Sequence, residues 1–286
     1  MPELNNYYNQ HLGILLDSEE QMLEGMKQLS KWGPNPNTPV KFWRNEQVNA
    51  RWWNETYPAH ADFEYRHNEW GFRSGPIVRE CDVAFYGCSQ TYGTGVPENT
   101  RWCDLVANQH GLTFNNFGVG GAGTDKILDI FWATSQHIKM RTAVFMLNGL
   151  YRPHVVLGNG EDIEYHALSA QTAQTNGNIK IKELVYYRDQ LFSMPDEYFE
   201  HINVQSIIKI YRLCKLMNIR AIFSSYLDYH ESFLAIQKQL PITVTPAAHT
   251  VLEELRLDNK DKLARDRSHL GMEANQKLAL LFKDLF

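Results

Sequence analysis

Four short segments of this sequence carry residues that could perform chemistry on an acyl group. They contain Ser89, a glycine-rich loop at 118–123, Asn148, and the pair Asp266 and His269. A serine hydroxyl becomes a nucleophile when a histidine takes its proton and a carboxylate orients the histidine ring. Backbone N–H groups and asparagine amides can stabilise the oxyanion that the attack creates. Each segment taken singly is more typical of an ordinary polar turn, so one motif alone does not decide between the two interpretations.

The glycine-rich loop also admits a different function. Gly118, Gly120 and Gly123 form the G-x-G-x-x-G pattern of dinucleotide-binding proteins. That function needs an acidic residue about 20 positions further on, but neither Asp nor Glu occurs between Phe131 and Gly160. The alternative is that one N–H group of this loop points at the same anion as Ser89.

The surrounding sequence alternates between buried strands and amphipathic helices. Apolar runs predict strands at 82–87, 112–117, 142–147 and 219–224. Helical patterns predict a helix that is capped by Asn99 or Thr100 and ends at Gly111, and further helices around 127–132, around 207–213 and from 272 to 285. This alternation predicts a three-layer α/β/α sandwich with a central parallel sheet. Such sheets bind ligands beyond the carboxyl ends of their strands, where three of the four segments lie.

In order and context the four segments resemble the SGNH hydrolases, also called the GDSL-like esterase/lipase family. Gly87–Val96 is similar to the block that usually reads Gly-Asp-Ser, and Asn116–Gly121 is similar to Asn-x-Gly-x-x-Gly. Asp266–His269 matches the final Asp-x-x-His, and Asn68–Arg73 matches the Asn-x-x-Gly-Phe-Arg lead-in of some members. The resemblance covers about 68–150 and 260–286, and it implies a flavodoxin-like fold.

The resemblance implies a serine esterase or a related O-acyltransferase. Ser89 would be the nucleophile, His269 the base and Asp266 the group that orients it. The Ser89 N–H, the Gly121 N–H and the Asn148 amide would form the oxyanion hole. No metal and no cofactor is expected.

The substrate is expected to be an acyl ester of a carbohydrate or another small molecule, with Tyr92, Tyr151 and Arg152 in contact with it. Hydrolysis and acyl transfer use the same residues, so the sequence leaves both open. An alternative is a weak or inactive protein of this fold that binds carbohydrate or has a structural role. Two departures from the family pattern motivate it: Cys88 replaces the usual Asp, and Gly149 follows Asn148. The aromatic stretch at 32–72 would then be a binding surface.

Composition fits a globular protein and argues against several other classes. Hydrophobic residues make up 43% and charged residues 21%, which excludes a disordered chain or a coiled coil. The net charge of −5 argues against nucleic acid as a partner, since phosphate binding needs clustered Lys and Arg. Neither a membrane span nor a signal peptide is recognised, so a cytoplasmic location is expected. Two parts are predicted: an N-terminal helix with an aromatic-rich extension at 1–76, and an α/β domain at 77–286 with an insertion at about 150–203.

Overall fold

The computed structural model describes residues 41, 46–147, 154–158, 163–167, 193–225, 236, 238, 240, 243–244 and 263–286. The predicted N-terminal helix lies outside these residues. Described helical elements that lie outside the sheet and its covering helices include α3 (Glu46–Thr56), η1 (Pro58–His60), α4 (Ser89–Tyr92) and η2 (Glu98–Thr100).

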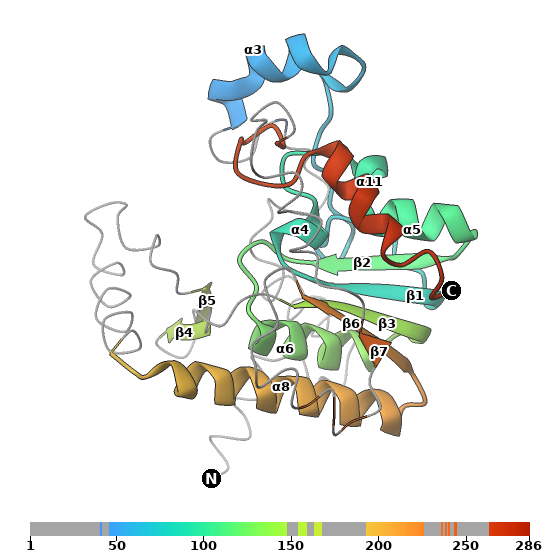
Figure 1. Cartoon of the computed structure of the whole chain (residues 1–286), viewed down its shortest axis with the longest axis vertical. Helices are drawn as coiled ribbons and strands as arrows, with labels where there is room; N and C mark the ends of the chain where they lie inside the picture. The colour runs from blue at the N-terminus through green and yellow to red at the C-terminus, as the bar shows by residue number, and fades with distance from the viewer. Residues whose placement is uncertain are drawn as a thin grey trace.

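A parallel sheet forms the centre of the molecule (Figure 1). Its strands are β1 (Glu80–Gly87), β2 (Phe114–Gly118), β3 (Lys139–Leu147), β6 (Arg220–Ser225) and β7 (Thr243–Val244), in the order β2-β1-β3-β6-β7. This is the flavodoxin-like order, in which the chain reverses direction across the sheet between β1 and β3. The four predicted strands are confirmed, whereas the two-residue β7 was too short to leave a sequence pattern. A separate antiparallel hairpin, β4 (His154–Gly158) and β5 (Ile163–Ala167), lies in the predicted insertion.

Helices cover both faces of the sheet, as the strand residues require (Figure 1). Val83 and Phe85 of β1 pack toward α5 (Trp102–His110) and α11 (Met272–Leu280). Their neighbours Ala84 and Tyr86 pack toward α6 (Thr124–Ser135) and α8 (Asp196–Leu216). Because successive strand side chains point to opposite faces, an uninterrupted apolar run needs cover on both sides. The predicted three-layer α/β/α architecture is confirmed.

Several predicted boundaries were wrong. Neither Asn99 nor Thr100 caps α5: both belong to η2, and the Thr100 hydroxyl donates to the Pro97 carbonyl instead. Gly111 does end α5, in a left-handed conformation with φ of 63°. The last helix stops at Leu280 rather than 285. Helix α8 runs from Asp196 to Leu216 and so overlaps the end of the insertion predicted at about 150–203, which itself stays a prediction.

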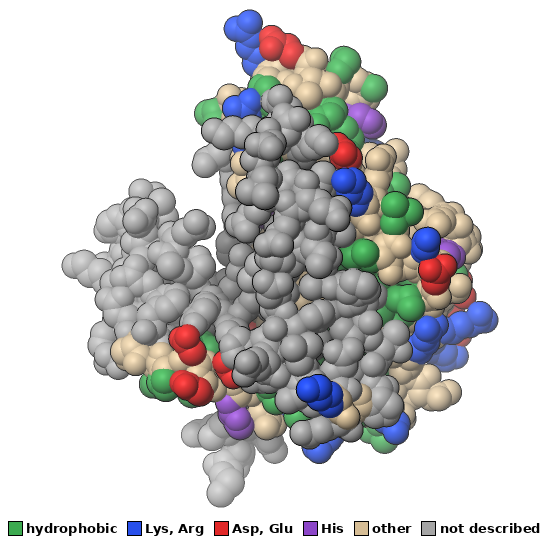
Figure 2. Space-filling model, viewed as in Figure 1, with side chains coloured by type: hydrophobic (Ala, Val, Ile, Leu, Met, Phe, Trp, Pro, Cys, Tyr) green, Lys and Arg blue, Asp and Glu red, His purple; other side chains and the backbone are tan. Residues whose placement is uncertain are grey.

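The described part of the aromatic stretch is packed into the molecule. Trp53, Tyr65, Trp70 and Phe72 are at most 1% exposed. Exposed hydrophobic side chains of described residues occur among polar and charged ones in Figure 2. No described helix combines the length and apolar character needed to cross a bilayer.

Candidate active site

Ser89 lies where sequence analysis placed it, directly beyond the carboxyl end of β1. Strand β1 ends at Gly87, Cys88 continues in an extended conformation, and Ser89 begins the single turn α4. The Ser89 carbonyl accepts hydrogen bonds from the Gly93 N–H (2.9 Å) and the Thr94 N–H (3.0 Å). Gly93 adopts a left-handed conformation (φ 80°), which closes the turn at a position that favours glycine. The Ser89 loop (Gly87–Val96) is therefore a compact turn, and its serine is 8% exposed.

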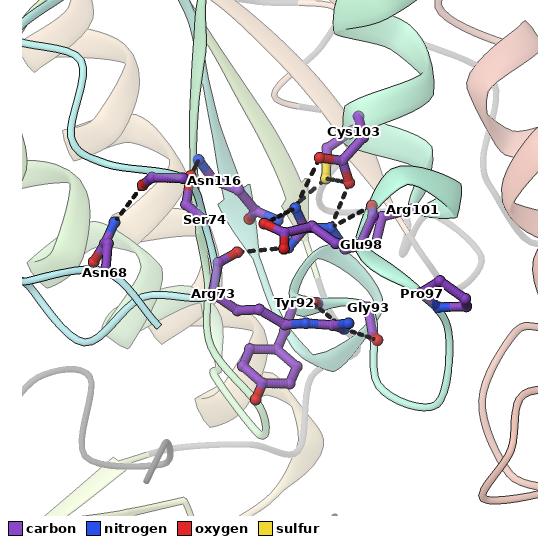
Figure 3. A network of polar contacts seen from close by, with 12 residues as sticks. Asn68, Arg73, Ser74, Tyr92, Gly93, Pro97, Glu98, Arg101, Cys103 and Asn116 are labelled. Carbon is purple, nitrogen blue, oxygen red and sulfur yellow. Dashed lines mark hydrogen bonds and ion pairs between the residues drawn. The ribbon is translucent and has the colours of Figure 1, made fainter. Parts of the chain in front are cut away.

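Strand β2 holds the Ser89 loop from one side. The Asn116 amide donates to the Thr91 carbonyl (2.8 Å), and its oxygen accepts from the Gly118 N–H (2.9 Å). Figure 3 shows Asn116 directed at this loop. A Cβ on Gly118 would lie 2.3 Å from the Tyr92 nitrogen. Close approach of α4 thus accounts for this glycine without a bound dinucleotide.

Gly118→Ala is expected to lower the free energy of unfolding by about 1–3 kcal/mol, because the new methyl group meets backbone that has no room to move. Urea unfolding measures the change. Gly75→Ala is the matched control, since a Cβ there meets nothing within 4 Å. Equal unfolding midpoints for the two variants would show that α4 does not need the close approach.

Two of the three predicted oxyanion donors are described. Gly121 lies in the loop after β2 with φ of 76°. Among the described residues, neither the Ser89 N–H nor the Gly121 N–H has a hydrogen-bond acceptor. Asn148 follows β3 directly but lies outside the described residues, as do Tyr151 and Arg152. Their predicted roles stay predictions.

Asp266 and His269 form a tight turn before α11, with the histidine ring against the carboxylate. The distance from His269 Nδ1 to Asp266 Oδ2 is 2.5 Å. Asp266 Oδ1 accepts from the Ser268 and His269 N–H groups (3.0 Å each), and Oδ2 accepts from the Ser268 hydroxyl (2.7 Å). Arg267, between them, has φ of 56°. The carboxylate therefore organises both the turn and the ring.

The electrostatics of this turn decide which nitrogen of His269 can act as a base. Burial by itself would raise the pKa of Asp266, but hydrogen bonds and charge from His269, with further bonds from Ser268, lower that pKa to about 2. An ionised carboxylate only accepts hydrogen bonds, so Nδ1 of His269 carries a proton. In the neutral ring Nε2 is then unprotonated and can accept one.

A main-chain contact joins the Ser89 loop to the Asp266–His269 turn. The Arg265 N–H donates to the Gly95 carbonyl (2.9 Å). A Cβ on Gly95 would lie 2.6 Å from Cβ of Ala264 and 3.3 Å from the Asp266 nitrogen. These contacts place two segments 170 residues apart in sequence, from Gly95 to Arg265, next to each other in space.

Buried arginines brace the loop, and sequence analysis did not anticipate them. Arg73 is fully buried and donates to the carbonyls of Tyr92 and Gly93 (Figure 3) and to the carbonyl of Val96. Arg101 donates to the Arg73 carbonyl (2.5 Å) and pairs with Asp104 through two of its nitrogens. Arg73 ends the lead-in motif Asn68–Arg73, and this was the only signal available. Among the described residues, no cluster of His, Cys, Asp or Glu could hold a metal ion.

Tyr92, predicted to contact substrate, is 6% exposed. Its ring stacks on Tyr65 with centroids 5.8 Å apart, and its hydroxyl lies 2.9 Å from His67 Nε2. The contacts with Tyr65 and His67 hold the Tyr92 ring in place. A role in substrate binding stays a prediction.

A plot of log kcat/KM against pH should show one acid limb with a limiting slope of one, because protonation of a single group should abolish the activity of an enzyme built on this site. The folded pKa of Asp266, about 2, lies below the ordinary value of 3.8, so its carboxylate is lost only as pH falls through about 2. Burial, with the charge of Arg73, lowers the pKa of His67 to about 4, which keeps that ring neutral at working pH. Measuring log kcat/KM against pH checks this. A limiting slope of two above pH 5 would contradict it.

No protein-family model and no curated protein sequence matches this chain. Solved structures do match. A proposed lipolytic protein of the G-D-S-L family from Desulfitobacterium hafniense is 13% identical, with 73% of this chain and 100% of that chain covered and a TM-score of 0.46. The esterase EstA from Pseudoalteromonas is 10% identical (72% and 96% covered, TM-score 0.46). The acetylxylan esterase Axe2 from Geobacillus stearothermophilus is 13% identical (71% and 92% covered, TM-score 0.43). At these identities the likeness concerns fold alone.

Proposed function

We propose that this protein is a serine ester hydrolase of the SGNH type, in which Ser89, His269 and Asp266 are nucleophile, base and orienting carboxylate. The observation that carries the proposal is the 2.5 Å contact between Asp266 and His269, in a turn joined through Arg265 and Gly95 to the Ser89 loop. An ionised carboxylate that fixes the proton on Nδ1 prepares Nε2 to accept one from a serine.

In the first step the Ser89 oxygen forms a bond to the carbonyl carbon of the ester. The hydroxyl proton passes to His269 Nε2, and an electron pair of the carbonyl moves to its oxygen. The Ser89 N–H, the Gly121 N–H and the Asn148 amide would stabilise that oxyanion, each by roughly 3–4 kcal/mol in the transition state.

In the second step the tetrahedral intermediate collapses. The bond to the leaving alcohol breaks, the alcohol oxygen takes the proton from His269, and an acyl-Ser89 remains. Water then attacks the acyl carbon while His269 accepts a proton from it, which gives a second tetrahedral intermediate. When this collapses, the bond from the acyl carbon to the Ser89 oxygen breaks, that oxygen takes the proton back from His269, and the acid is released. A sugar hydroxyl in place of water would give acyl transfer by the same residues.

The substrate we propose is a short-chain acyl ester of a carbohydrate or another small molecule. The support comes from sequence: Tyr151 and Arg152 supply an aromatic and a hydrogen-bonding group after the third strand. A long lipid chain would instead require a groove lined by aliphatic side chains. The alternative of an inactive carbohydrate-binding protein gains no support from the described aromatic residues, because Trp53, Tyr65, Trp70 and Phe72 are buried in packing.

The direct test combines a fluorophosphonate probe with a panel of esters. The probe should label the native protein at one serine, and p-nitrophenyl acetate should be cleaved faster than the decanoate. An O-acetylated xyloside, with and without a free sugar acceptor, separates hydrolysis from transfer. A folded protein that neither reacts with the probe nor cleaves any ester in the panel would refute the proposal.

A further inference from the structure

A buried carboxylate in α3, which precedes the sheet in sequence, is linked through Tyr65 and Arg265 to the Ser89 loop and the Asp266–His269 turn. Glu46, the first residue of α3, has no exposed surface. One of its oxygens accepts a hydrogen bond from the Tyr65 hydroxyl. The other accepts from Nε (2.8 Å) and Nη2 (2.6 Å) of Arg265, whose side chain is also fully buried.

Tyr65 and Arg265, the two partners of Glu46, both form a hydrogen bond with the backbone of Gly95 in the Ser89 loop. The Gly95 N–H donates to the Tyr65 hydroxyl oxygen (2.7 Å). The Gly95 carbonyl accepts from the Arg265 N–H (2.9 Å). Both polar backbone groups of this residue are thus held by the two partners of a single carboxylate. Arg265 also immediately precedes Asp266 in the chain, so through Arg265 the same carboxylate is linked to the start of the Asp266–His269 turn.

The protonation states support this set of contacts. Burial, together with the nearby Glu46 carboxylate, raises the pKa of Tyr65, so its hydroxyl stays protonated and donates to Glu46 while it accepts from Gly95. The Arg265 guanidinium stacks over the Phe63 ring, 3.7 Å from its centroid. Helix α3 makes a second contact with the turn, where the Arg267 guanidinium lies 4.3 Å from the centroid of a Trp52 ring.

A fully buried ion pair is poor evidence for stability, because removing two charges from water offsets most of their attraction. Apolar side chains of similar size would stabilise the fold equally well. What apolar residues would not supply is directed hydrogen bonds that fix two loops in one arrangement. A misplacement of about 1 Å in a catalytic group can cost up to about 100-fold in rate.

We propose that Glu46, through Tyr65 and Arg265, is a positioning residue that fixes the Ser89 loop and the Asp266–His269 turn relative to each other. The inference rests on the proposed function, since it concerns two segments that must react together. It assigns the part of the chain before the sheet a role in catalysis rather than in substrate binding.

Tyr65→Phe tests one arm, because it removes only the hydroxyl between Glu46 and Gly95. The double variant Glu46→Gln with Arg265→Met tests the other arm. It removes both buried charges together, so neither is left unpaired, and the introduced glutamine amide can still accept from Tyr65. The matched control is Glu55→Gln, which removes an exposed carboxylate from the same helix, where it pairs with Arg51 (2.9 Å).

The readout is kcat per active site, with sites counted by fluorophosphonate titration, together with KM and the melting temperature. We expect kcat per titrated site to fall about tenfold in both Tyr65→Phe and the double variant, with KM within about twofold of wild type. Glu55→Gln should match wild type. A purely structural role would lower the number of titratable sites or the melting temperature and leave the rate per site unchanged.

An unchanged rate per titrated site in Tyr65→Phe would overturn the inference, and this conservative variant decides if the double variant does not fold. Failure of the proposed function gives a different result. In that case the wild-type protein takes up no probe, or Ser89→Ala cleaves esters as fast as wild type.

Discussion

Ser89→Ala is expected to lower kcat/KM for p-nitrophenyl acetate by about 10⁴- to 10⁶-fold. The methyl side chain cannot form the acyl-enzyme bond, so only the slow attack by water in the presence of the proposed oxyanion donors would remain. The protein should stay folded, because the described contact of the Ser89 hydroxyl is a weak one to the Cys88 sulfur at 3.9 Å. Steady-state rates and labelling by a fluorophosphonate measure the loss.

Two control variants make this result specific. Ser206→Ala removes a serine hydroxyl that is buried to a similar degree on α8, and it should keep full activity. Cys88→Ala removes the neighbouring thiol and should also stay labelled. Loss of labelling in Cys88→Ala, with Ser89→Ala still active, would assign the nucleophile to the cysteine.

The central fold was predictable because each sheet strand except β7 leaves a local signal. An apolar run such as 82–87 must be covered on both faces, and the pattern of the helices that follow supplies the cover. The loops after the first two strands could be placed because parallel topology brings the carboxyl ends of strands to one edge. The turn before the last helix was indicated by its Asp-x-x-His motif alone. Helix caps were less predictable, since the Thr100 hydroxyl donates to the nearby Pro97 carbonyl instead of capping α5.

The charged groups that hold the site could not be predicted. Residues 253–267 form a mixed charge run that suggests a solvated loop, but Arg265 within it has no exposed surface. Its partner Glu46 is 219 positions away in sequence. A local pattern does not identify which charge in such a run will be buried, because that depends on a residue brought near only by the tertiary fold.

Removing the proposed base, His269, should have an effect almost as large as removing the proposed nucleophile, Ser89. His269→Ala is expected to lower kcat/KM by about 10⁴- to 10⁶-fold, and Asp266→Asn by about 10²- to 10⁴-fold with KM little changed. The asparagine can present its N–H₂ to Nδ1, which would favour the tautomer protonated on Nε2 and leave no base toward the serine. It also withdraws the charge that stabilises the imidazolium formed during attack.

Combining the variants tests whether these residues act as one unit. If they do, Ser89→Ala with His269→Ala should be little slower than Ser89→Ala alone, because once the nucleophile is gone the base has no serine proton to accept. Independent contributions would instead multiply. His249, which lies outside the described residues, is the competing histidine: full activity in His269→Ala with loss of activity in His249→Ala would move the base to that position. We propose His269, because its ring is held by an ionised carboxylate in a turn that contacts the Ser89 loop.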